Sequence, residues 1–225
     1  MTCATTEAKN VAGLSGLVLI AALLLATTGC ANYAQFETAE ALGYGESKAG
    51  GGVTLTRYDT GYQPGDEADL QVTVPAVMAW YRYGLMEGFE VRAAMWIPMG
   101  GRIGAKYQLV GANGEEGFDL SVGADFSYNQ TTIGSGDDAT EITYLDLYLP
   151  VQTGYRMTPA LAAYFTPKFI GGLRTGDIDT TFAPTPAATA GIALGEDTQF
   201  HIEGTGGYDF QAQGPVFTAG LGVAF

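Results

Sequence analysis

The sequence predicts an all-β fold, a single up-and-down antiparallel transmembrane β-barrel of ten strands that follows a cleaved signal peptide. Apolar and polar residues alternate with period two over most of the chain. Many alternating segments match the ~9–11 residues that a tilted strand needs to cross a bilayer. Charged residues make up only 15% of the chain, while glycine (33 residues) and tyrosine (13 residues) are abundant. Since no second long apolar run follows the first, strands that face lipid explain this composition best.

The first thirty residues have the pattern of an export signal. An unbroken apolar run, Val11 to Ala26, leads into Thr27-Thr28-Gly29-Cys30. A run of this length is a signal-peptide core or a membrane anchor, and the residues after it decide which. A small residue directly before a cysteine resembles the lipobox of bacterial lipoprotein signals. That resemblance covers residues 1–30 and implies cleavage before Cys30 and a diacylglycerol on its sulfur.

Together with the alternation further along the chain, this resemblance predicts three parts: a signal peptide at 1–29, a lipidated N-terminus and periplasmic tether at 30–45, and a barrel at 46–225. The tether is expected to hold a helical turn or two. An ordinary secretory signal and an uncleaved anchor helix are the alternatives, and in each case the protein leaves the cytoplasm. Because Cys3 lies in the signal, cleavage leaves Cys30 as the only cysteine, and no disulfide can form within the mature chain.

Ten segments with period-two alternation follow the tether, separated by turn-forming residues. In the clearest of them, apolar residues from Phe118 to Tyr128 share one face and polar residues from Asp119 to Asn129 share the other. Short connections alternate with longer polar ones, as in outer-membrane barrels. The predicted strands are 46–58, 69–83, 89–99, 102–110, 117–129, 141–156, 160–173, 183–195, 199–210 and 214–225.

Two further resemblances concern the barrel. The last strand alternates from Phe217 to a terminal Phe225, which resembles the C-terminal strand signal of Gram-negative outer-membrane proteins. The stretches 81–85, 89–91 and 104–109 resemble a hairpin pattern of uncharacterised bacterial outer-membrane barrels. These resemblances imply an architecture and a location in the cell outer membrane, lipid-anchored and membrane-spanning. They imply no activity.

The direction of the two faces separates a membrane barrel from a soluble one. A soluble barrel of lipocalin type needs a charged exterior, yet only Lys48, Lys106 and Lys168 remain as lysines after the signal. We therefore expect the apolar faces to point outward. The polar faces then place a charge network in the lumen, made of Arg82, Glu90, Arg92, Lys106, Asp119, Asp125, Asp146, Arg156, Lys168, His201 and Glu203.

This luminal network should be crowded. Mixed charges away from water need partners, so each of Arg82, Arg92 and Arg156 should find a carboxylate. Ten strands enclose little more space than eight, which side chains just fill. Bulky side chains share the predicted luminal face: Met78, Trp80, Trp96, Tyr144, Tyr148 and Tyr164. The sequence thus predicts a plugged or very narrow interior.

Charge and motifs restrict the function. The net charge of −14 argues against nucleic acid as a partner. His201, the only histidine, has no serine beside it on its strand, and neither a metal-ligand spacing nor a phosphate loop follows the signal. The acidic residues of the longer loops are expected to be solvated, with a bound divalent cation as the alternative; they are Asp66, Glu67, Asp69, Asp137, Asp138, Glu141, Asp177 and Asp179.

The sequence favours a non-catalytic outer-membrane β-barrel lipoprotein without cofactor or metal, serving as an envelope structural protein or a narrow passage for small solutes. Its expected partners are outer-membrane lipids and the barrel-insertion and lipoprotein-sorting machinery. Two alternatives stay open. One is a barrel enzyme that acts on envelope lipid, and the other is a soluble, lipid-anchored barrel that binds an apolar ligand.

Overall fold

The computed structural model describes residues 32–60, 70–97, 100–111, 116–133, 140–177, 179–211 and 213–225. The signal region and Cys30 therefore lie outside the described residues, as do the acidic loop residues Asp66, Glu67, Asp69, Asp137 and Asp138. Within the described ranges, no helix is long and apolar enough to span a membrane.

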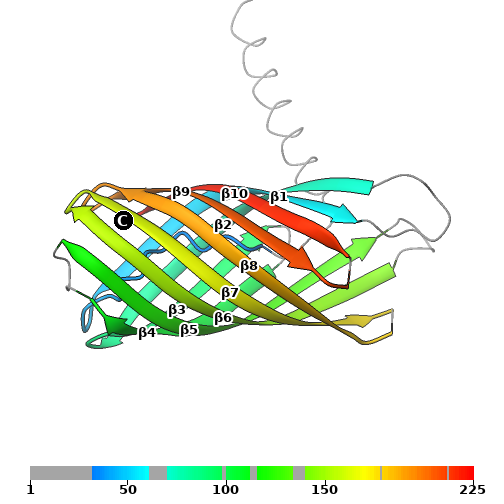
Figure 1. Cartoon of the computed structure of the whole chain (residues 1–225). Helices are drawn as coiled ribbons and strands as arrows, with labels where there is room; N and C mark the ends of the chain where they lie inside the picture. Colours follow the sequence, from blue (N-terminus) through cyan, green and yellow to red (C-terminus); the bar gives the residue numbers. More distant parts are fainter. Residues whose placement is uncertain are drawn as a thin grey trace, which may run out of the picture.

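Ten antiparallel strands form one closed barrel, in which each strand pairs with its neighbours in sequence and the first strand pairs with the last (Figure 1). This arrangement confirms the predicted all-β, up-and-down barrel. The strands are β1 (Ser47–Thr60), β2 (Leu70–Met86), β3 (Phe89–Ile97), β4 (Gly100–Val110), β5 (Gly117–Ile133), β6 (Thr140–Thr158), β7 (Leu161–Gly176), β8 (Thr181–Leu194), β9 (Gln199–Asp209) and β10 (Gly214–Ala224).

The two ends of the barrel differ in their connections. Two-residue turns join β2 to β3 and β6 to β7 at one end, which we call the turn end. The opposite end, which we call the loop end, carries the nine-residue connection between β1 and β2. The C-terminus lies at the turn end, where Phe225 and Ala49 exchange backbone hydrogen bonds of 2.9 and 3.1 Å.

Apolar side chains cover the outside of the barrel. In β7, Phe165, Phe169 and Leu173 are exposed, while the alternating Tyr164 and Lys168 are buried. Exposed large apolar side chains occur on all ten strands. A continuous apolar surface of this kind fits the hydrocarbon core of a bilayer, and barrel closure leaves no strand edge unpaired there. A soluble barrel that binds an apolar ligand needs the opposite arrangement, so this alternative is wrong.

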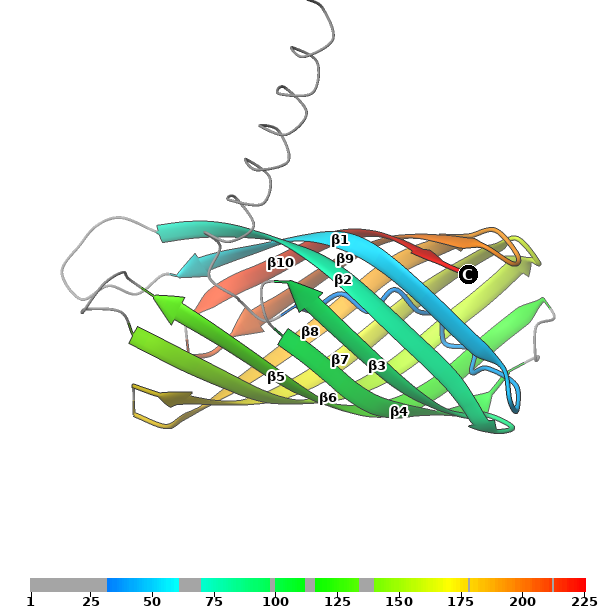
Figure 2. The same ribbon diagram turned by 180° about the vertical axis from the view of Figure 1, so that it is seen from behind.

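Residues 32–43 lie inside the barrel or at its turn-end mouth and do not form the predicted periplasmic tether. Figures 1 and 2 show this stretch as the blue trace within the ring of strands. Each residue from Asn32 to Ala39 is buried, and the stretch is an irregular chain without the expected helical turns. Ten strands enclose enough additional space for one extended chain, which accounts for the difference. We call residues 32–43 the luminal segment.

The luminal segment runs toward the turn end. Tyr33 contacts Lys168 near the middle of β7, whereas Gly45 donates a backbone hydrogen bond of 2.9 Å to Gly84, close to the β2–β3 turn. The chain then enters β1 at Ser47.

The assignment of faces predicts the effect of a charge on the barrel exterior. Leu147, on β6, is 47% exposed on the apolar outer surface. Leu147→Arg should destabilise the barrel by about 2–4 kcal/mol, because arginine near the bilayer midplane loses its hydration. The free energy of unfolding, measured in lipid vesicles by denaturant titration, checks this, with Leu147→Met as the matched control. Equal stabilities of the two variants would show that β6 does not present this face to lipid.

Candidate functional site

The luminal segment obtains hydrogen bonds for its backbone N–H groups from side chains of the barrel wall. An irregular buried chain has no strand partner, so its backbone polar groups need other acceptors. Gln35 and Phe36 donate their N–H groups to the two carboxylate oxygens of Glu203, at 2.7 and 2.8 Å. Nearer the turn end, Leu42 donates to Glu90 at 3.0 Å. Wall carboxylates thus replace the missing strand partner.

Basic side chains of the wall donate hydrogen bonds to the backbone carbonyl groups of the same segment. Lys106, on β4, has its ammonium group fully buried and donates to two carbonyls that lie two residues apart. Hydrogen bonds to charged groups are the stronger kind in a protein interior. The carbonyl contacts are Lys168 to Tyr33 (2.6 Å), Arg102 to Ala34 (3.1 Å), Lys106 to Thr38 (3.1 Å), and Lys106 and Arg82 to Glu40 (2.8 and 2.9 Å).

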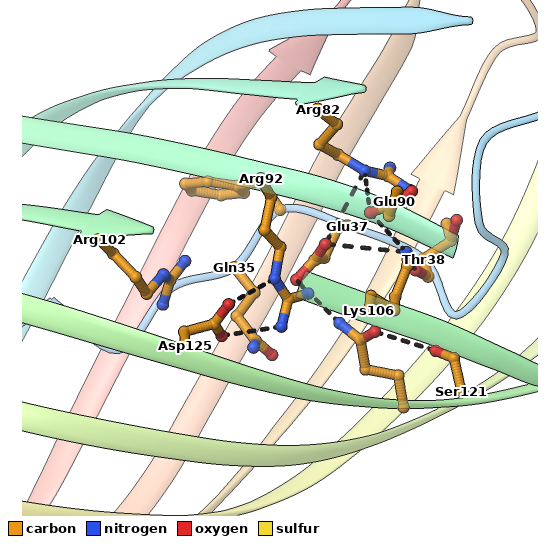
Figure 3. Close-up of polar contacts among 12 residues, drawn as sticks. Gln35, Glu37, Thr38, Arg82, Glu90, Arg92, Arg102, Lys106, Ser121 and Asp125 are labelled. Carbon is orange, nitrogen blue, oxygen red and sulfur yellow. Dashed lines mark hydrogen bonds and ion pairs between the residues drawn. The ribbon is translucent and has the colours of Figure 1, made fainter. Parts of the chain in front are cut away.

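Glu37 is the charged centre of the luminal segment (Figure 3). Its carboxylate forms a hydrogen-bonded ion pair with Arg92 and accepts a hydrogen bond of 2.8 Å from the Gln152 amide. Arg82 and Lys106 approach the other carboxylate oxygen at 3.9 and 3.8 Å. Four wall side chains from β2, β3, β4 and β6 therefore converge on one carboxylate.

The two arginines of this site are also held by the wall itself. Arg82 donates to Glu90 through Nε (2.8 Å) and Nη2 (2.7 Å), and Arg92 donates to Asp125 through Nε (2.6 Å) and Nη2 (2.8 Å). Lys106 lies 3.1 Å from the same Glu90. Such two-point contacts fix the plane of each guanidinium group. The wall thus orients these cations without help from the luminal segment.

Phe36 fills a recess formed by glycines of the first and last strands. Its ring stacks on Trp80, with ring centroids 5.1 Å apart and an interplanar angle of 22°. A Cβ atom on Gly52, Gly220 or Gly222 would lie 2.6–3.0 Å from this ring, closer than side-chain carbons tolerate. Phe36 itself has φ of +50°, a left-handed conformation that non-glycine residues rarely adopt.

Every residue of the predicted charge network is buried in the barrel, from 0% exposure at Glu90 and Lys106 to 9% at Arg156. The structure gives each of the three arginines a carboxylate, and that of Arg156 is Glu40 of the luminal segment. Three further network residues form hydrogen bonds with uncharged side chains of the wall: Asp119 with Gln108 (3.1 Å), Asp146 with Ser127 (3.1 Å) and Lys168 with Thr189 (2.8 Å). The ring of His201 packs edge to face against that of Tyr164, with 6.2 Å between the centroids.

Five charged residues of the interior were missed at the sequence level. Glu37 and Glu40 belong to a segment that was expected to lie in the periplasm. Arg102 could have been found, because period two places it on the same face of β4 as Lys106; in the structure it lies over the Tyr148 ring at 5.5 Å. Arg174 and Asp209 form an ion pair between β7 and β9.

The interior concentrates the basic residues of an acidic protein. Eight of the ten lysines and arginines have side chains in the lumen or at its mouths: Lys48, Arg82, Arg92, Arg102, Lys106, Arg156, Lys168 and Arg174. Six buried wall carboxylates oppose them among the described side chains: Glu90, Asp119, Asp125, Asp146, Glu203 and Asp209. Counted among the buried wall side chains alone, six cations (Arg82, Arg92, Arg102, Lys106, Arg156 and Lys168) face these six carboxylates.

Little space remains around residues 32–39 of the luminal segment, whereas residues 40–43 border a hollow of about 440 Å³ beside the β2–β3 turn. A cavity of about 10 Å³ lies between Gln35, Trp80 and Arg102, enough for roughly one water molecule. A vestibule of about 180 Å³ lies at the turn end, beside Arg82 and Arg156. Within the described part of the chain, no cluster of three or more histidine, cysteine, aspartate or glutamate residues has the geometry to hold a metal ion.

Comparison with known proteins finds no matching family model and no matching curated protein. Solved structures with a similar course include an outer-membrane channel from Pseudomonas putida F1 (TM-score 0.49, 12% identity, covering 87% of this chain and 99% of that one). Two others are Ail, the attachment invasion locus protein of Yersinia pestis (0.38, 13%, 81% and 99%), and the N-terminal β-barrel domain of Pseudomonas aeruginosa OprF (0.35, 13%, 80% and 99%). At these TM-scores and identities the likenesses transfer no function to this chain.

Fold and lumen together define a membrane-type β-barrel whose interior is occupied by its own luminal segment.

The pairing of Arg82 with Glu90 predicts a stability effect. Arg82→Gln should destabilise the barrel by about 3–5 kcal/mol, because it leaves a buried carboxylate with one cation fewer. Denaturant unfolding in vesicles checks this, with Arg57→Gln, an exposed arginine of β1, as control. Equal stability of both variants would mean that the luminal pair contributes nothing to the fold.

Proposed function

We propose that this protein is a non-catalytic outer-membrane barrel, sealed at rest by its luminal segment, that serves as an envelope structural protein or a narrow passage for small solutes. The observation that supports the sealed state most directly is the burial of Asn32 to Ala39 between ion-paired wall side chains. The apolar exterior and the polar, filled interior support a place in a bilayer.

The passage is favoured over a purely structural role by the way the luminal segment is held. Its contacts with the wall are hydrogen bonds, ion pairs and ring packing, and the sequence has no cysteine after Cys30. The segment is about as wide as one extended chain. Its withdrawal would open a gap of roughly 5 Å by 10 Å, which admits small solutes only.

Conductance in planar bilayers tests this proposal. The unmodified protein should show little or no steady current. A full-length double variant, Phe36→Ala with Glu37→Gln, should show frequent openings, since it loses the ring in the glycine recess and the charge that Arg92 binds. A double variant at exposed positions, Tyr44→Ala with Glu87→Gln, is the matched control. Large, stable, solute-permeable channels from the unmodified protein would contradict the sealed state and favour an open porin.

The absence of catalysis is part of the same proposal. His201 is 2% exposed, and its ring packs against Tyr164 inside the barrel, where substrate lipid would have to displace the luminal segment. Hydrolysis of envelope lipid by the purified protein that disappears in His201→Ala would favour the alternative of a barrel enzyme.

We further propose that Cys30 is acylated after removal of residues 1–29, and that sorting to the outer membrane follows because Ala31 stands where aspartate retains enteric lipoproteins in the inner membrane.

Mass spectrometry of the mature protein tests the anchor. We expect an N-terminus at Cys30 that carries the lipid mass, and Cys30→Ser should abolish lipid labelling and accumulate the precursor. A mature N-terminus at any other residue, or an unmodified Cys30, would contradict lipidation and favour an ordinary secretory signal.

A further inference from the structure

Two of the wall cations around Glu37 are fixed in place by other side chains of the wall. Arg82 and Arg92 each donate two hydrogen bonds to a wall carboxylate, so their positions do not depend on Glu37. Arg92 keeps its Nη1 free of these wall contacts and directs it to Glu37. A preformed donor set of this kind binds an anion without a large cost for ordering side chains.

The orientation of Gln152 indicates the same ligand chemistry. Ser121 donates a hydrogen bond of 3.0 Å to Gln152 Oε1, which leaves the amide Nε2 to point toward Glu37 (2.8 Å). Arg92 and Gln152 donate hydrogen bonds to one oxygen of this carboxylate, and Arg82 and Lys106 lie 3.9 and 3.8 Å from the other oxygen. Two N–H donors and two further nearby cations suit a carboxylate.

Charge also favours an anion in this position. Arg82, Arg92 and Lys106 face two wall carboxylates, Glu90 and Asp125, and are thus left with one unbalanced positive charge when Glu37 is absent. An unbalanced buried charge is costly, so the site requires an anion from some source. Glu37 supplies it in the closed barrel.

A vestibule on the aqueous side borders this site. The turn-end vestibule of about 180 Å³ has Lys48, Arg82 and Arg156 in its wall, together with Thr38 and Glu40 of the luminal segment. Arg82 lines this vestibule and also faces Glu37, so it connects the opening with the buried site. The vestibule also contains Glu46 and Glu196, so basic residues are not its only charges.

We propose that Arg82, Arg92, Lys106 and Gln152 form a binding site for a small carboxylate solute, and that Glu37 occupies this site in the closed barrel as an internal competitor. Binding of the solute displaces Glu37 and releases the luminal segment. This inference rests on the proposed function as a narrow passage and gives that passage its solute class, small organic anions.

Tryptophan emission reports the displacement independently of conductance. Phe36 stacks on Trp80, so withdrawal of the segment exposes Trp80 to water and shifts its emission to longer wavelength. The full-length protein with Trp96→Phe leaves Trp80 as the only tryptophan, because the chain has two. Succinate added to this protein in detergent should give a saturable red shift, and potassium chloride at the same ionic strength should give none.

Variants of the Trp96→Phe protein test whether the emission shift arises from succinate bound at the proposed site. Glu37→Gln removes the competing charge and should lower the half-saturating succinate concentration at least about tenfold, whereas Glu87→Gln, at the exposed β2–β3 turn, should leave it unchanged. Arg92→Lys keeps the charge but loses the second N–H group that binds Asp125, and should raise this concentration about tenfold. Heat-dependent gel migration verifies that each variant is folded. If Glu37→Gln does not fold, the half-saturating succinate concentration of Arg92→Lys tests the site by itself.

Equal shifts with succinate and chloride, or a half-saturating concentration that neither Glu37→Gln nor Arg92→Lys changes, would overturn the carboxylate site. Conductance of the same proteins separates this inference from the proposed function. A specific succinate shift without current supports the site and contradicts the passage, whereas openings that succinate does not influence support the passage and contradict the site.

Discussion

The interior of this barrel depends on one constraint: the backbone of the luminal segment must have hydrogen-bond partners in a place that offers neither bulk water nor a strand edge. Glu203 accepts two consecutive N–H groups, and Lys106 donates to two carbonyls. Charged side chains at these positions would be costly in an empty, dry lumen. Their placement is explained once the segment that they bind is included.

Packing adds to these polar contacts and fixes the position of the segment along the barrel. Phe36 requires the open surface that Gly52, Gly220 and Gly222 provide on β1 and β10, so the strands that close the barrel also form the recess for the segment. The glycine content that indicates a membrane barrel at the level of composition thus has a particular use here. Larger residues at these three positions would push the ring, and with it the segment, away from the wall.

The strands and their faces could be predicted from sequence because period two is a local property, readable from Phe118 to Tyr128 without knowledge of the rest of the chain. The luminal position of Lys106 and Glu90 follows from the same alternation. The luminal segment could not be predicted, because it has no alternation and its partners are distant in sequence: Gln35 and Glu203 are 168 residues apart.

Amide hydrogen exchange of the folded, full-length protein in detergent or bilayers tests the central claim most directly, namely that the luminal segment is seated inside the barrel by wall side chains. The amides of Gln35, Phe36 and Leu42 should be protected to the same extent as amides in the middle of β5, while that of Tyr44, exposed at the turn end, should exchange rapidly. If the amides of Gln35 and Phe36 exchanged as fast as that of Tyr44, the luminal segment would not be held inside the barrel by wall side chains.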